Sequence, residues 1–87
     1  MIVFAVIEVS NAAVIQTALE THFPGDFLKL SFSNWLVAGR GITAKDVSDK
    51  LGISEGQSNG IVFTTAGYYG RAPGNVWEWM NAKIAQT

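Results

Sequence analysis

The side chains best placed for chemistry are the carboxylate of Glu8 and the guanidinium groups of Arg40 and Arg71. Glu8 follows an apolar run, and carboxylate oxygens together with water are the ligands that Mg²⁺ prefers. In a symmetric dimer, two Glu8 carboxylates could share one ion. The alternative is a solvated Glu8 at the rim of a sheet, hydrogen-bonded to the amides of Ser10–Ala12. We favour this alternative, because one carboxylate makes no metal motif.

Arg40 and Arg71 each lie in a glycine-flanked loop, and Tyr68 and Tyr69 precede the second of them. An arginine beside aromatic rings can bind a phosphate or stack on a base. The loop GYYGRAPG lacks the spacing of a dinucleotide-binding or P-loop fingerprint. A surface loop or a dimer contact is therefore the interpretation we favour over a phosphate or nucleic-acid site.

His22 is the single histidine, and the chain contains no cysteine. No serine and carboxylate accompany His22 in an arrangement typical of a catalytic triad. A charged histidine at the C-terminal end of a helix is favoured by the helix dipole, so a structural role or simple exposure is expected. The lack of cysteine excludes disulfides, thiolate catalysis and zinc–thiolate sites.

The composition describes an apolar chain with few charges. Apolar residues make up 48% of the 87 residues and charged residues 15%, against about 25% charged in an average domain. This balance suggests that a second subunit buries part of the surface. Six Lys/Arg against seven Asp/Glu give no basic excess, so the charge does not support a nucleic-acid partner. The apolar run Ile2–Ile7 is too short to span a membrane, and a single cytoplasmic domain over residues 1–87 is expected.

The central stretch DFLKLSFSNWLVAGRG predicts two strands joined by a turn at Ser33-Asn34. In the first strand, Leu28, Leu30 and Phe32 alternate with polar residues, which is typical of a strand with one wet face. The second strand, Trp35–Ala38, is apolar on both faces, as an interior strand is.

Strands and helices are predicted on both sides of this hairpin. Ser10 or Asn11 is expected to cap the first helix. Thr43 with Asp46 resembles a capping box, and Asp46 is expected to pair with Lys50 one turn later. Besides the hairpin, the predicted elements are a strand at Ile2–Ile7, a helix at Ala12–Phe23, a short helix after Thr43, a strand at Gly60–Thr65 and a helix from Asn75 to Ala85.

The order β-α-β-β-α-β-α is the split βαβ pattern of an α+β, ferredoxin-like sandwich with an extra C-terminal helix. This pattern places the first and third strands in the middle of the sheet and two helices on one face. Because both middle strands are apolar on both faces, the second face also needs a cover. We expect the C-terminal helix and a second subunit to contribute to it.

Trp77 and Trp79 lie two residues apart on the C-terminal helix, hence roughly 200° apart around its axis. One tryptophan is therefore expected to pack inward with Met80 and Ile84, and the other to face outward or toward a partner. Exposed aromatic residues on a small domain with few charges often mark a protein interface. Trp77, Trp79, Tyr68 and Tyr69 are the candidate interface residues.

The segments SFSNWLVAG, IVFTT and YYGRAPGNVWEWM resemble the SinR-like family of small uncharacterised bacterial proteins. That family is similar to the ferredoxin-like CRISPR adaptation protein described as an endoribonuclease. The resemblance implies a ferredoxin-like homodimer with no established activity. It also places Glu8 where the adaptation proteins carry a metal-binding aspartate near the end of the first strand.

Three functions are compatible with these residues. The leading hypothesis is a homodimeric, non-enzymatic interaction or assembly module without a cofactor. The first alternative is a metal-dependent endoribonuclease or other nuclease related to the CRISPR adaptation proteins, with Mg²⁺ at Glu8 and a phosphate at Arg40 or Arg71. The second alternative is a small-ligand binding domain with a pocket between the sheets of the dimer.

Overall fold

A computed structural model describes residues 1–86 as four strands and three helices. Their order, β-α-β-β-α-β-α, confirms the predicted order of elements. The elements are β1 (Ile2–Ser10), α1 (Ala12–His22), β2 (Phe27–Ser31), β3 (Asn34–Gly39), α2 (Ala44–Lys50), β4 (Asn59–Thr64) and α3 (Gly74–Ala85).

The four strands form one antiparallel sheet in the order β2-β3-β1-β4. β1 and β3 occupy the middle, as their apolar sequences predict. In the β1–β3 ladder Phe4 lies opposite Val37, and in the β1–β4 ladder Ala5 lies opposite Phe63. Because side chains alternate along a strand, these pairs belong to opposite faces of the sheet. The protein is therefore an α+β domain built on a sheet with two apolar faces.

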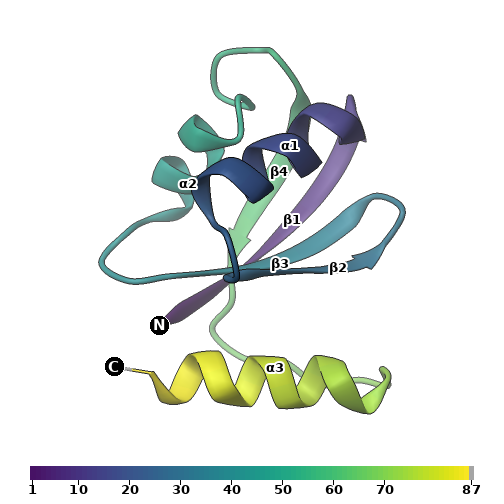
Figure 1. Cartoon of the computed structure of the whole chain (residues 1–87), viewed down its shortest axis with the longest axis vertical. Helices are drawn as coiled ribbons and strands as arrows, with labels where there is room; N and C mark the ends of the chain where they lie inside the picture. Colours follow the sequence, from purple (N-terminus) through teal and green to yellow (C-terminus); the bar gives the residue numbers. More distant parts are fainter. Residues whose placement is uncertain (87) are drawn as a thin grey trace.

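One face of the sheet is covered by α1 and α2, which lie together on one side in Figure 1. At its centre is Trp35, which is 1% exposed and donates its indole N–H to Oε1 of Gln16 at 2.8 Å. This bond supplies a partner for a polar group that burial removes from water. The buried core of this face consists of Phe4, Val6, Ile15, Leu19, Phe23, Trp35, Val37, Val47 and Leu51.

The opposite, outer face is partly covered by α3, which crosses it alone (Figure 1). Val76 and Met80 of α3 are buried against Val3 and Leu36 of the sheet. In the last turn of α3, Nζ of Lys83 lies 2.8 Å from Oδ1 of Asp26, which precedes β2, in a partly buried ion pair. The expected C-terminal cover of the second face is thus present.

The prediction that only one of Trp77 and Trp79 packs inward is wrong. Both are half-buried and both pack against the cluster of Val76 and Met80. With 100° per residue, the line through Val76 and Met80 lies about 80° from each tryptophan, on opposite sides. The two rings therefore flank the buried line of the helix symmetrically. Ile84, expected beside Met80 in the core, is 42% exposed.

Two local predictions near the strand ends are also corrected. The hairpin turn lies at Phe32-Ser33, one residue earlier than predicted, because β2 bulges between Lys29 and Ser31. The bulge ends the alternation, and Phe32 is left 87% exposed. The predicted cap of α1 by Asn11 is also wrong, because Asn11 has a left-handed backbone conformation and its side chain does not cap the helix. The side-chain Nδ2 of Asn11 donates instead to the backbone carbonyl of Gln57 at 3.2 Å.

The packing of α3 predicts that Met80→Ala destabilises the protein. Met80 is 4% exposed, so the truncation removes buried thioether contacts and leaves a cavity, at a cost of about 2–3 kcal/mol in unfolding free energy. Urea unfolding measures this change. Ile84→Ala on the same helix, where the side chain is 42% exposed, is the control and should cost well under half as much. Equal losses for both variants would show that α3 does not pack through Met80.

Candidate functional site

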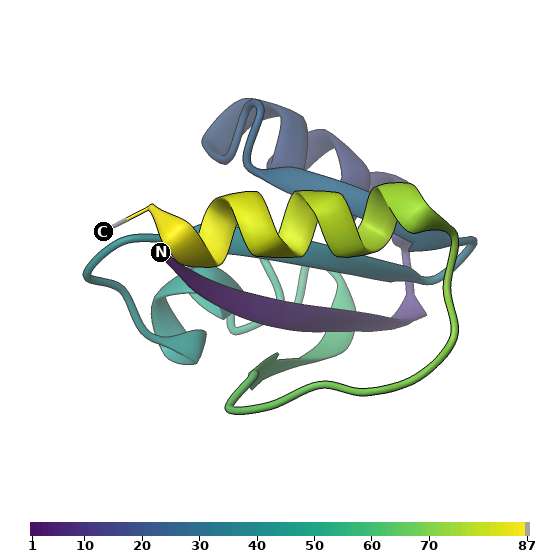
Figure 2. The ribbon, with the colours of Figure 1, turned by 90° about the horizontal axis from the view of Figure 1, so that it is seen from below.

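The outer face along β4 and the end of β1 is apolar and has no helix above it. Ile7 is 42% exposed, Ile61 51% and Phe63 48%. Ile7 and Ile61 lie opposite each other, and Phe63 lies opposite Ala5, which packs against the residues beneath α3. In Figure 2 β1 runs beside α3, and it packs against the helix near its start, at Val3. We call Ile7, Ile61 and Phe63 the outer-face patch.

None of the three patch residues was among the residues singled out from the sequence. The available signal was the run Ile61–Phe63, which is apolar on both faces like the central strands. β4 is instead an edge strand, and its outward side chains lie one strand beyond the part of the sheet that α3 covers. The extent of that cover depends on tertiary packing and is not encoded in the strand itself.

Of the four candidate aromatic residues, Trp79 packs on the sheet as described above, Tyr68 and Trp77 stack on each other, and Tyr69 lies in solvent. The rings of Tyr68 and Trp77 stack with centroids 5.8 Å apart and planes at 20°. The Tyr68 hydroxyl also donates to Oδ1 of Asn81 at 3.3 Å. Tyr69 is fully exposed. Tyr68 therefore fastens the segment between β4 and α3 onto the helix, and the assignment of these aromatics to an interface stays a prediction.

Glu8 lies near the end of β1, half-buried, on the face of Phe4 and Val6. Its backbone N–H donates to the carbonyl of Ser33 at 2.8 Å, which fixes it in the sheet. Within residues 1–86, no three acidic or histidine side chains gather closely enough to hold a metal ion. The magnesium site at Glu8 stays a prediction.

Arg40 and Arg71 are both exposed, and they lie in different parts of the molecule. Arg40 follows β3, and the turn there lies at the opposite end of the molecule from the start of α3 in Figure 2. Arg71 belongs to the segment that leads into α3. One phosphate could not contact both arginines of the same chain. His22 is exposed at the end of α1, beside an open hollow of about 430 Å³ along that helix.

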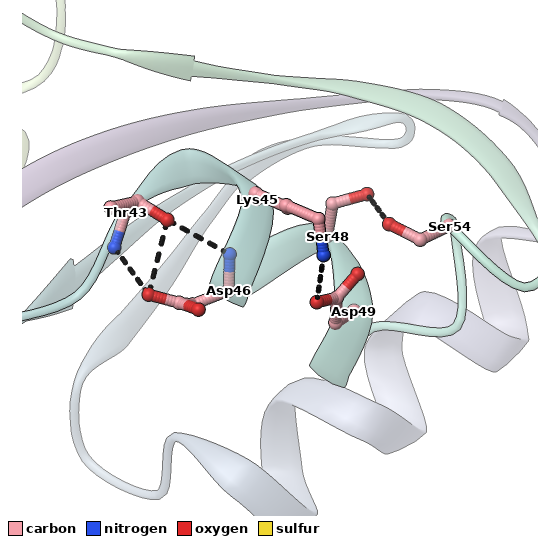
Figure 3. A network of polar contacts seen from close by, with 6 residues as sticks. All are labelled: Thr43, Lys45, Asp46, Ser48, Asp49 and Ser54. Atoms are coloured by element: carbon pink, nitrogen blue, oxygen red, sulfur yellow. Dashed lines mark hydrogen bonds and ion pairs between the residues drawn. The ribbon is translucent and has the colours of Figure 1, made fainter.

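A polar network at α2 is structural (Figure 3). The Thr43 hydroxyl accepts from the Asp46 amide at 3.2 Å, and the Asp46 carboxylate accepts from the Thr43 amide at 2.8 Å. This arrangement confirms the predicted capping box. The predicted pair between Asp46 and Lys50 is wrong, because the capping box uses the Asp46 carboxylate. The ion pair of this helix joins Lys45 to Asp49 at 2.9 Å.

The Lys45–Asp49 ion pair shifts the pKa values of both side chains in opposite directions. The hydrogen bond and charge of Asp49 raise the pKa of Lys45 above 10.5, and the hydrogen bond from Lys45 lowers the pKa of Asp49 below 3.8. Lys45 is 81% exposed and Asp49 40%, so solvent screens the pair. Its role is confined to the surface of α2.

Comparison with known protein families, with curated proteins and with solved structures finds no match to this chain. The resemblance to the SinR-like family therefore stays a prediction. In the part of the chain that the structure describes, no helix is long and apolar enough to cross a membrane.

The lowered pKa of Asp49 gives a pH dependence with a definite sign. A carboxyl with a lower pKa in the folded state adds stability above its unfolded value of about 3.8, and that stability is lost as the pH falls through the folded value. Asp49→Asn should therefore be slightly less stable than the wild type at neutral pH, and the difference should vanish in acid. Urea unfolding of both proteins, at neutral pH and in acid, measures this difference in the free energy of unfolding. Glu20→Gln on α1 is the control for loss of an exposed carboxylate, and a difference for Asp49→Asn that grows in acid contradicts the assignment.

Proposed function

We propose that this chain is a homodimeric, ferredoxin-like α+β domain that acts as an interaction or assembly module. The observation that carries the proposal is the outer-face patch of Ile7, Ile61 and Phe63, about half exposed on paired strands. Such a contiguous apolar surface next to a covered one is typical of a site where another protein binds. A binding surface of this kind needs no catalytic group.

The ferredoxin-like grouping is supported by the arrangement of the sheet and its helices. Taken from β4, the strands run β4-β1-β3-β2, with β1 and β3 in the middle. The helices that follow these two strands, α1 and α2, both pack on the face of Phe4 and Val37. α3 is an addition to this arrangement, on the other face.

The charge of the chain supports a protein partner over a nucleic acid. Six basic residues against seven acidic ones leave a formal net charge of −1. Nucleic-acid binding depends on a surplus of Lys and Arg that releases counterions from phosphates. The three residues of the outer-face patch carry no charge, and the exposed Arg40 and Arg71 do not lie together.

Sedimentation equilibrium tests the dimer directly. The chain has a mass of 9.4 kDa, and twice this mass is expected in the upper micromolar range. The apparent mass should fall on dilution and depend little on salt, because apolar contacts are not screened by ions. A monomer throughout the micromolar range contradicts the proposed function.

Incubation of the protein with RNA or DNA and Mg²⁺ or Mn²⁺ separates the module from the nuclease. We expect no cleavage above that of a mock purification. The matched variant is Glu8→Ala, which removes the one carboxylate proposed as a metal ligand. Metal-dependent cleavage that disappears in Glu8→Ala would refute the non-enzymatic proposal and support the alternative.

A further inference from the structure

The outer edge of β4 carries backbone groups with no partner among residues 1–86. The amide of Thr65 donates to the carbonyl of Val3 at 3.0 Å, so this residue turns its polar groups toward β1. On the other side of β1, the Glu8 amide donates to Ser33, which fixes the alternation of the ladder. Because antiparallel ladders alternate by residue, Gly60, Val62 and Thr64 point their N–H and C=O groups away from β1.

β4 also lacks the devices that keep sheet edges apart. Edge strands are commonly protected by charged side chains, by proline or by bulges. The other edge, β2, has two of these: Lys29 lies within the strand, and a bulge separates Lys29 from Ser31. The sequence of β4, NGIVFT, has no charge and no proline. The register shift of its ladder places the extra residue on β1, between Glu8 and Ser10, and leaves β4 without a bulge. Of the two edges, β4 is the one able to pair with another strand.

We propose that β4 pairs antiparallel with β4 of a second copy of this chain, about a two-fold axis at Val62. This inference rests on the proposed homodimer and assigns its surface. In this register Val62 faces its own symmetry mate, and Gly60 faces Thr64 of the other copy. Each of the three outward-pointing residues then exchanges both its N–H and its C=O with the partner strand. Other registers leave some of these groups unpaired.

The same register joins the two outer-face patches. Ile61 lies opposite Phe63 of the second copy in a non-hydrogen-bonded pair, where side chains come closest. Pairs of an aromatic and a β-branched residue stabilise antiparallel strands. The patch has no charged side chain that would repel its copy. The two half-covered faces thus become one apolar strip between the two α3 helices.

The size of the contact predicts moderate affinity. A protein interface of standard size takes about 800 Å² from each partner, roughly a sixth of the 5143 Å² exposed by this chain. The proposed contact is one six-residue strand edge with the three patch residues of each copy, well short of the roughly 20–30 residues a side of a standard interface. We therefore expect a dimer that dissociates at micromolar concentration.

This dimer also separates the two Glu8 side chains. Strand spacings of about 4.8 Å and a rise of about 3.3 Å per residue place them on the order of 20 Å apart. Two carboxylates at that distance cannot share one Mg²⁺, whose oxygen ligands lie at about 2.1 Å. Dimerisation through β4 therefore excludes the shared metal site considered for Glu8.

A disulfide test reads the register directly, because the chain contains no cysteine. Ile61→Cys and Phe63→Cys are prepared separately and then mixed under oxidising conditions. Opposite residues in the proposed register have Cα atoms about 4.5 Å apart, within the range that a disulfide spans. Positions 61 and 61, or 63 and 63, of the two copies lie about 8 Å apart, too far for a disulfide. A disulfide-linked dimer is expected in the mixture, and neither variant alone should form one.

Two charge variants provide a second readout by sedimentation. Ile61→Lys puts an ammonium group into the proposed interface, and Leu30→Lys makes the same change at the β2 edge, where Leu30 is 43% exposed. We expect Ile61→Lys to raise the dissociation constant at least tenfold and Leu30→Lys to leave it within about twofold. Circular dichroism confirms that both variants are folded.

The outcomes separate this inference from the proposed function. A monomeric wild type overturns both. A dimeric wild type without a disulfide in the mixture, or with a disulfide from either variant alone, overturns the β4 register and leaves the homodimer in place. A dimer lost in Leu30→Lys and kept in Ile61→Lys assigns the interface to the β2 edge and likewise overturns this inference.

Discussion

The structure depends on a central strand that is apolar on both sides. β1 presents Phe4 and Val6 to one face and Val3 and Ala5 to the other. Removing apolar surface from water is the main favourable term in folding, so both faces must be covered. Two helices cover the first face completely at its centre, where Phe4 and Val6 have no exposed surface. One helix covers the second.

That single helix is too narrow for a sheet of four strands. An α-helix with its side chains is about 10 Å wide, while four strands at about 4.8 Å spacing span nearly twice that. α3 lies over Leu36, Val3 and their neighbours, and its two tryptophans extend its reach to either side. Ile61 and Phe63 on the edge strand lie beyond that reach. The uncovered patch is thus a geometric consequence of one helix on a two-faced sheet. The proposed pairing at the β4 edge would bring it side by side with the patch of a second copy.

Much of this architecture could be predicted from the sequence, because it depends on local signals. The spacing of Ile15 and Leu19 predicts a helix, and Thr43 with Asp46 predicts where the next one begins. The bulge after Lys29 could not be predicted, because it depends on how β2 meets β3. The positions of Trp77 and Trp79 depend on which line of α3 docks on the sheet. The outer-face patch was missed for the same reason, since burial of a β4 side chain depends on where α3 comes to lie.

Amide hydrogen exchange, measured residue by residue by NMR, tests most directly whether the edge of β4 is paired in solution, as we propose. The outward amides of β4, those of Gly60, Val62 and Thr64, are compared with those of Phe27 and Lys29, which the alternation of the β2–β3 ladder turns away from β3. At high protein concentration, where a dimer is expected, we predict slow exchange for the amides of Val62 and Thr64, which becomes faster on dilution. The β2 amides should exchange fast at every concentration. Exchange at Val62 and Thr64 as fast as at the β2 edge, at every concentration, would contradict the proposed pairing.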